Sequence, residues 1–232
     1  RRPRGPGGRM VDMSLSPSSD PLSLLGVGPP GDGTGDVDDP VREQILDAAA
    51  AQFSSVGIAR STMGDITRRA GLARMTLYRR FSTKQELVEA ALMREASWFL
   101  ADLQREIDTH DTVEDKLTEG FAFTVARLRN HGLLNRLLET EAESTVPYFT
   151  VQGGPLITAA AHFLAGVVSR SVNDSRSHEE VLVVSEVAVR LVISFILSPS
   201  MIINLDDPAV MREFARNQLG PLLGPSEFPT GG

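Results

Sequence analysis

Hydrophobic side chains recur every three or four positions along most of the chain from residue 40 onward, which is the period of an amphipathic helix. In the first such segment, about 40–56, Val41, Ile45 and Phe53 fall on one face. Two short segments follow within 62–81, and longer ones lie near 84–109, 112–130, 133–145, 155–173, 178–198 and 208–220. Glycines and prolines separate these segments, and no stretch alternates as a convincing strand. The pattern predicts an all-α protein.

Residues 1–39 show neither a helical nor a strand period and are rich in Gly, Pro, Ser and Asp. Such a segment buries too little apolar surface to offset its chain entropy, so we expect a disordered tail. A basic arm that enters a DNA minor groove is the alternative, but the arginines lie at positions 1, 2, 4 and 9, far from the first helix. That helix is expected to begin at Asp39-Pro40, a capping acid followed by proline. A second flexible tail is predicted at 225–232.

The two short segments within 62–81 have the layout of a helix-turn-helix unit. Thr62 and Asp65 have the spacing of a capping box, and Gly71 provides the positive φ that ends the first helix. Leu77 and Phe81, four positions apart, form the buried stripe of the second helix. The outer face of that helix is then predicted to carry Arg74, Met75, Tyr78 and Arg79.

Charge supports this interpretation. Between Arg60 and Lys84 there are seven basic residues and one acidic residue, although the whole chain has a formal net charge of −7. A basic island in an acidic protein indicates a local contact with a polyanion. The alternative, a solvated helix surface, is weaker here because the charge coincides with the helix-turn-helix pattern.

The segment ILDAAAAQFSSVGIARSTMGDITRRAGLARMTLYRRFSTKQELVEAAL, within about 41–92, resembles the DNA-binding domain of the TetR (tetracycline-repressor-like) family of transcriptional regulators. The resemblance implies an N-terminal helix-turn-helix domain at 40–92 and a larger ligand-binding and dimerisation domain at 93–224. It also implies a homodimeric repressor that a small effector releases from a palindromic double-stranded DNA operator. We expect no cofactor.

The resemblance also assigns roles to single residues. Thr76, Tyr78 and Lys84 match family positions that contact DNA phosphates, and Lys84 begins a helix, whose backbone N–H groups help to bind an anion. Ala73 stands where the family usually has a capping serine, so we expect a weaker cap. Met75 and Arg80 replace residues that are often glycine and histidine. The predicted DNA-binding residues are Thr62, Arg74, Met75, Thr76, Tyr78, Arg79 and Lys84.

The segment 181–197, VLVVSEVAVRLVISFIL, is apolar on almost every side. Glu186, Arg190 and Ser194 form one polar stripe at i, i+4 and i+8, and two interior charges make a poor membrane span. Such a helix must be buried on most faces. In the family that the chain resembles, the last two helices pair between subunits, so we assign 178–198 and 208–220 to the dimer interface. A core helix of a monomer is the alternative.

Catalytic chemistry is not apparent. The chain has no cysteine, and its four histidines share no metal-ligand spacing with one another or with carboxylates, so neither an enzyme nor a metal site is predicted. The glutamates at 139, 141 and 143 are interpreted as a solvated helix face. Aromatic residues of the larger domain suit an uncharged hydrophobic effector, although each of them alone is as well explained by core packing. The predicted ligand-binding residues are Trp98, Phe121, Phe149, His162 and Phe163.

Two further function classes stay open beside the regulator. One is an interaction module, or an effector-independent DNA binder, that keeps the helix-turn-helix fold, and the other is a small helical enzyme. The retained Arg74, Arg79 and Lys84 argue against the module, and no catalytic constellation supports the enzyme. Without cysteines, and with the apolar run LSLLGVG too short for a signal peptide, the chain is expected to be cytoplasmic.

Overall fold

The computed structural model describes residues 39–170 and 177–223. Of the tails predicted at 1–39 and 225–232, only Asp39 lies within these residues, where it caps α2. Within the described ranges the chain forms helices and no β-strand, which confirms the all-α prediction. The helices are α2 (Pro40–Val56), α3 (Met63–Ala70), α4 (Arg74–Arg80), α5 (Lys84–Ile107), α6 (Val113–Arg129), α7 (Gly132–Thr140), α8 (Ala142–Thr145), η1 (Val146–Phe149), α9 (Gly154–Val168), α10 (His178–Leu197), α11 (Pro208–Gln218) and η2 (Gly220–Leu223).

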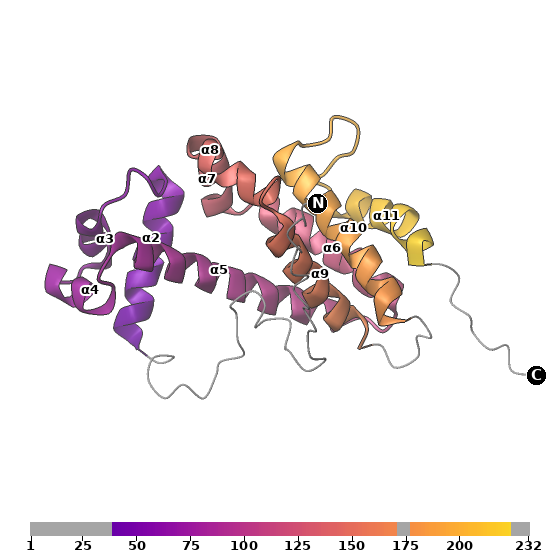
Figure 1. The fold of residues 1–232 in the computed structure, drawn as a ribbon, viewed down its shortest axis with the longest axis horizontal. Helices are drawn as coiled ribbons and strands as arrows, with labels where there is room; N and C mark the ends of the chain where they lie inside the picture. Colours follow the sequence, from indigo (N-terminus) through magenta and orange to yellow (C-terminus); the bar gives the residue numbers. More distant parts are fainter. Residues whose placement is uncertain (1–38, 171–176, 224–232) are drawn as a thin grey trace, which may run out of the picture.

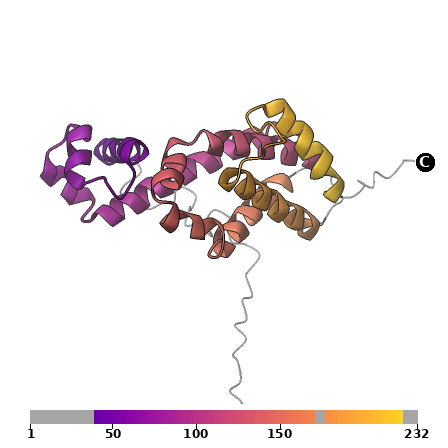
Figure 2. The same cartoon turned by 90° about the horizontal axis from the view of Figure 1, so that it is seen from above.

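The molecule is elongated, with α2, α3 and α4 at one end and the larger helical domain at the other (Figures 1 and 2). Helix α5 belongs to both parts. Its first half packs on α2 through Leu87 and Ala91, and its second half enters the larger domain through Leu100, Leu103 and Ile107. A single continuous helix therefore connects the two ends.

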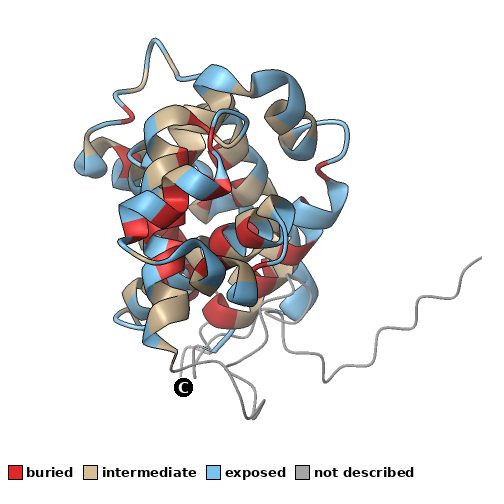
Figure 3. Ribbon diagram, turned by 90° about the vertical axis from the view of Figure 1, so that its left-hand side faces the viewer, coloured by how far each residue is buried: buried red, intermediate tan, exposed pale blue. Residues whose placement is uncertain are grey.

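The N-terminal helices enclose a small core. Fully buried side chains from each of them meet there, namely Ile45, Leu46, Phe53, Ile66, Leu77 and Leu87. Figure 3 looks onto this end of the molecule and shows buried residues on the inner sides of the helices. Leu133 of α7, which is 3% exposed, belongs to the same cluster, and Leu137 packs against it. One helix of the larger domain thus completes the core of the N-terminal unit.

Two further clusters form the larger domain. The first joins α5, α6, α9 and α10 around Val113, Leu117 and Phe163. The second joins α6, α10 and α11, where the rings of Phe121, Phe195 and Phe214 contact one another at centroid distances of 5.5 to 6.3 Å, Phe121 stacking on Phe214 and Phe195 meeting both edge to face. Phe121 and Phe163 therefore belong to different clusters.

Helix α10 is buried on one side and open on the other. Val181, Val184, Ala188 and Val192 face the core, whereas Val183 is 59% exposed. The predicted Glu186–Arg190 pair is present, with the Arg190 nitrogens 2.6 and 2.8 Å from Glu186 Oε1. Within the described residues no single helix passes a length and hydropathy test for a membrane span; only α8–η1 and α9 taken together do, across a 53° bend.

The prediction of one continuous helix at 133–145 is wrong, because the helix breaks at Glu141. There the backbone takes φ −136° and ψ 32°, and the short α8 and η1 follow. Pro147, inside η1, cannot donate the hydrogen bond that would continue a helix. The helix predicted at 155–173 ends at Val168, and residues 171–173 lie outside the described ranges.

Candidate DNA-binding surface and larger domain

The first helix of the helix-turn-helix unit is capped at both ends. Thr62 Oγ1 accepts from the Asp65 N–H at 3.1 Å, and Asp65 Oδ2 accepts from the Thr62 N–H at 3.2 Å, which completes the predicted capping box. Hydrogen bonds from Thr62 and Arg68 hold the pKa of the Asp65 carboxyl below its ordinary value of 3.8. Gly71 ends the helix with φ +67°, as predicted.

Helix α4 follows this turn and presents its outer face to solvent. Leu77 and Phe81 are 0% and 2% exposed, so the predicted buried stripe is present. Met75 is 79% exposed, so its apolar side chain is available for an intermolecular contact and contributes little to the core. Ala73 gives α4 no side-chain cap, as expected from the missing serine. The exposed residues of α4 are Arg74, Met75, Arg79 and Arg80, with Thr76 and Tyr78 half-buried.

The arginines of this surface differ in their partners. Arg74 lies over the Tyr78 ring, 5.3 Å from its centroid, and the Tyr78 hydroxyl is 3.4 Å from Arg74 Nη2. Arg80 pairs with Asp39 at 2.7 Å, so part of its charge is neutralised by the α2 cap. Among the described residues no ion pair involves Arg79. Arg74 and Arg79 are therefore better placed than Arg80 to meet a polyanion.

Lys84 lies at the start of α5, beside the turn that joins α2 to α3. Its ammonium donates to the Ala59 carbonyl at 3.2 Å. Thr83 caps the same helix end by accepting from the Glu86 N–H at 3.1 Å, so the helix start that carries Lys84 is fixed. The ammonium has three N–H donors, which leaves two for a phosphate.

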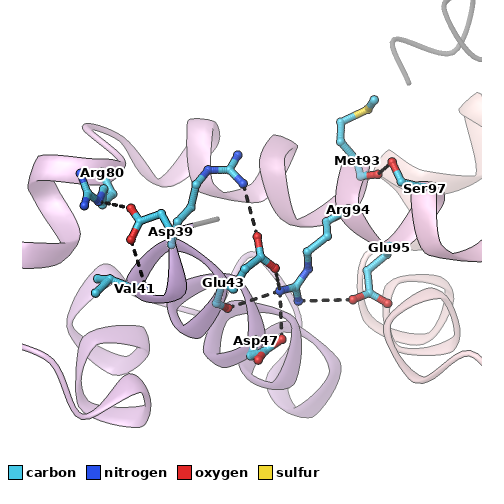
Figure 4. Close-up of polar contacts among 10 residues, drawn as sticks. Asp39, Val41, Glu43, Asp47, Arg80, Met93, Arg94, Glu95 and Ser97 are labelled. Carbon is cyan, nitrogen blue, oxygen red and sulfur yellow. Dashed lines mark hydrogen bonds and ion pairs between the residues drawn. The ribbon is translucent and has the colours of Figure 1, made fainter. Parts of the chain in front are cut away.

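A charged cluster that the sequence did not reveal holds α5 against α2 (Figure 4). The Arg94 side chain is only 9% exposed, and its Nη1 lies 2.9 Å from Asp47 and 3.1 Å from Glu43. The same guanidinium lies 4.3 Å from the centroid of the Trp98 ring. Glu43 and Asp47 are one helical turn apart, which was the available signal for a shared partner. Losing Arg94 would remove the partner of Asp47, whereas Glu43 would keep Arg42 at 3.7 Å.

The predicted effector residues lie in several places. Phe121 and Phe163 are buried in the two different clusters of the larger domain, and His162 and Phe149 are half-buried. Trp98 is 49% exposed on the outside of α5. One surface hollow is lined by Asp102, Arg105, Glu106, Phe123 and Arg127, and another by Arg129 and the 200–206 loop. Neither hollow includes any of the five predicted residues.

A carboxylate and histidine group occurs where α5 ends. Glu106, His110 and Glu119 bring ligand atoms within 4.8 Å of one another, so the expectation that no histidine shares a metal-ligand spacing with carboxylates overlooked Glu106 and His110, one turn apart. Arg212 of α11 occupies this group, since its Nε lies 2.6 Å from Glu119 Oε2. Glu119, with lesser help from Glu106, raises the pKa of Arg212. This ion pair accounts for the arrangement without a metal ion.

Comparison with known proteins now decides the family. Residues 45–91 match the family described as bacterial regulatory proteins, tetR family. Residues 112–216 match the family described as bacterial tetracyclin repressor, C-terminal domain. The chain belongs to the TetR family. Proteins of this family are transcriptional regulators and not enzymes, which confirms the expectation that the chain is not catalytic.

Named relatives of this TetR-family chain are regulators. The HTH-type transcriptional repressor KstR2 of Mycolicibacterium smegmatis is 28% identical over 110 residues, which are 47% of this chain and 54% of that protein. The regulator AlkX of Mycobacterium tuberculosis is 25% identical over 166 residues, 68% of this chain and 76% of AlkX. TtgR of Pseudomonas putida is 33% identical over 109 residues, 45% of this chain and 51% of TtgR. The matches to KstR2 and TtgR thus span only about half of those proteins.

Solved TetR-family structures share the fold. The repressor AlkX from Dietzia sp. superposes with a TM-score of 0.56 at 25% identity, covering 82% of this chain and 100% of that one. The regulator FadR from Bacillus halodurans superposes with a TM-score of 0.53 at 15% identity, covering 82% and 98%. These likenesses agree with an N-terminal helix-turn-helix domain followed by a larger helical domain.

Proposed function

We propose that this TetR-family regulator is a homodimeric repressor that binds a palindromic operator and leaves it when a small hydrophobic effector binds the larger domain. One observation carries the DNA-binding part: the exposed face of α4 presents Arg74, Met75 and Arg79, and α5 begins with Lys84 directly after the short turn that follows α4. A short exposed basic helix with a phosphate-binding helix start at its side suits a DNA major groove. The cytoplasm is the proposed location, since operator DNA lies there.

The DNA-facing residues divide into two roles. Thr76, Tyr78 and Lys84 are proposed to bind phosphates and so to fix the position of the protein on the duplex. Arg74 and Arg79 are proposed to read base edges, because a guanidinium binds the O6 and N7 of guanine in a bidentate manner. Thr62 and Met75 complete the proposed DNA-binding set. The stacking of Arg74 on Tyr78 holds that guanidinium near its reading position before DNA arrives.

The dimer is proposed to form through 178–198 and 208–220. The open face of α10 carries Val183, Arg190 and Ser194, which lie along one side at helical spacing, with the partly buried Val187 between them. A second copy that covers this face would bury Val183 and bring two reading helices into two-fold symmetry. Two-fold symmetry in turn favours a palindromic operator.

The proposed effector is uncharged and hydrophobic. The larger domain is rich in apolar and aromatic side chains, and side chains of this kind favour apolar ligands where they line a pocket. The Dietzia repressor AlkX is described as implicated in biodegradation of n-alkanes, which is compatible chemistry. Trp98, Phe121, Phe149, His162 and Phe163 remain the proposed contacts, in a conformation that opens between the two clusters. Such an effector would act by favouring a spacing of the reading helices that no longer fits the operator.

The test is a salt titration of binding to the DNA upstream of the protein's own gene. Lys84→Ala should weaken binding equally across operator variants and reduce the salt slope by about one. Arg79→Ala should cost about 1–3 kcal/mol and relax the preference at particular base pairs. Arg105→Ala, an exposed arginine at the far end of α5, is the control and should leave affinity unchanged.

Two outcomes would contradict the proposal. Binding without any sequence preference would remove the operator. Operator binding that no ligand of the larger domain alters would leave an effector-independent DNA binder.

A further inference from the structure

Glu141 is set apart from the glutamates on either side of it. Glu139 and Glu143 are exposed, as a solvated helix face requires. Glu141 instead is half-buried, and its Oε1 accepts a hydrogen bond of 2.8 Å from the Ala59 N–H, 82 positions earlier in the chain. The interpretation of all three glutamates as solvated surface is therefore wrong for Glu141. This carboxylate of the larger domain reaches the turn between α2 and α3.

The backbone around Glu141 fixes where its carboxylate lies. Its N–H donates to the Leu137 carbonyl at 2.8 Å, and its own carbonyl accepts from the N–H groups of Ser144 and Thr145 at 3.2 and 3.0 Å. Glu141 therefore ends α7 and begins α8 at the same point. At this helix break the carboxylate reaches the N-terminal unit, against which Leu133 and Leu137 of α7 also pack.

The turn that receives this carboxylate includes a glycine, so no side-chain atom is present at that position. Gly57 has φ +87°, a conformation that favours glycine. A Cβ on Gly57 would lie 2.8 Å from Glu141 Oε1 and 2.9 Å from Thr140 Oγ1, too close for any other residue without movement. The Gly57 carbonyl is also held, by the Ser61 hydroxyl at 2.6 Å. The turn is thus held by one hydrogen bond within it, from Ser61, and by one from the larger domain, to Glu141.

Ala59 links this contact to the DNA-binding surface. Its N–H is bound by Glu141, and its carbonyl accepts from Lys84 Nζ at 3.2 Å. A single residue therefore stands between a carboxylate of the larger domain and a lysine proposed to hold a DNA phosphate. Because both hydrogen bonds use backbone atoms, moving the turn moves the anchor of Lys84.

We propose that Glu141 is a positioning residue for DNA binding, which holds the Gly57–Ser61 turn where Ala59 can direct Lys84 toward a phosphate. The inference rests on the proposed function, because it assumes that Lys84 meets DNA. Charge-assisted hydrogen bonds to a backbone N–H are among the stronger ones, so this contact is suited to set a position. A shift of α7 would break it and release Lys84 from its place beside the groove.

The experiment measures operator affinity of the full chain by fluorescence anisotropy at several salt concentrations. Glu141→Ala should lower affinity roughly tenfold and reduce the salt slope by about one, because a phosphate contact is lost. Glu141→Gln keeps an acceptor oxygen at the same reach and should restore most of both. Glu143→Ala is the matched control, an exposed glutamate two positions away, and should behave as the wild type.

A double-mutant cycle with Lys84→Ala separates positioning from general stability. If Glu141 acts through Lys84, Glu141→Ala should add little further loss in the Lys84→Ala background. Glu141→Asp, one methylene shorter with its charge kept, should reproduce the loss if the alanine variant folds poorly. Full additivity, or a wild-type salt slope in both Glu141→Ala and Glu141→Asp, would overturn the inference. A Lys84→Ala variant with unchanged operator affinity would instead contradict the proposed role of Lys84.

Discussion

At the scale of single residues, the capping box of α3 shows how one pair of side chains settles a helix start. Thr62 and Asp65 satisfy each other's backbone N–H groups, and Arg68 lies 2.5 Å from the Asp65 carboxylate. The ionised carboxylate is the form that these contacts favour, which is why its pKa lies below 3.8. The cap therefore depends on pH while the surrounding core does not.

Asp65→Asn should lower the thermal unfolding midpoint of the protein at neutral pH. The gap between the midpoints of the variant and the wild type should become smaller as the pH is lowered. A depressed pKa in the folded state contributes stability above the ordinary value of 3.8, and this contribution is lost as pH falls through the folded-state value. Thermal unfolding followed by circular dichroism across that range checks it. Thr62→Ala, which removes the cap at every pH, should cost about 1 kcal/mol. A difference between Asp65→Asn and wild type that stays constant with pH would speak against the assignment.

At the scale of elements, α4 depends on its neighbours more than on its own ends. Seven residues are too few for a stable isolated helix, and the N-cap residue Ala73 offers no side-chain acceptor. Its backbone, at φ −71° and ψ 142°, already has the extended conformation of an N-cap. Leu77 and Phe81, buried against α2 and α3, therefore supply most of what holds the helix in place.

Ala73→Ser should raise the free energy of unfolding by about 1 kcal/mol, because the serine Oγ can accept from the Met75 N–H, whereas the Thr76 N–H already donates to the carbonyl of residue 73 at 2.9 Å. Urea unfolding of the full chain measures it. The same exchange at Ala96, an exposed interior position of α5, should give no gain, since serine is a weaker helix former than alanine. Equal effects at both positions would mean that capping is not the cause.

At the scale of the whole molecule, the open face of α10 is the feature that one chain leaves incomplete. Val183 is 59% exposed in the second turn of a helix whose other side is core. The Glu186–Arg190 pair lies on the open side, so an interface there would be apolar with a charged stripe across it. Such a mixture is typical of an interface that selects one register of pairing.

Val183→Glu should shift the protein from dimer to monomer at micromolar concentration, because a glutamate there would bury a charge without a partner. Sedimentation velocity reports the change directly. Val151→Glu makes the same exchange at a position that is 89% exposed in a different part of the larger domain, and should leave the dimer intact. A Val183→Glu protein that stays dimeric would move the interface away from this face.

Local patterns predicted what local forces determine. The spacing of Leu77 and Phe81, the glycine at 71 and the threonine at 62 each identified their structural roles, because caps and buried stripes depend on residues within one turn. Arg94 reaches a carboxylate 51 positions away, and Glu141 reaches Ala59 over 82 positions. The hydrophobic period of the sequence cannot predict contacts between residues so far apart in the chain. The separation of Phe121 from Phe163 likewise follows from tertiary packing.

The presence of Leu133 in the N-terminal core limits how this protein can be divided and recombined. A fragment that ends near residue 92 would lack α7 and leave an apolar surface of α2 in water. Exchanging the N-terminal DNA-binding units of related regulators at that boundary would pack α2 of one protein against α7 of another, and these two surfaces would not be complementary. A working chimera would have to carry α7 along with α2 to α4, although residues 93–131 of the larger domain lie between them in the sequence. In this chain the helices that fold together as the DNA-recognition unit are therefore not contiguous in the sequence.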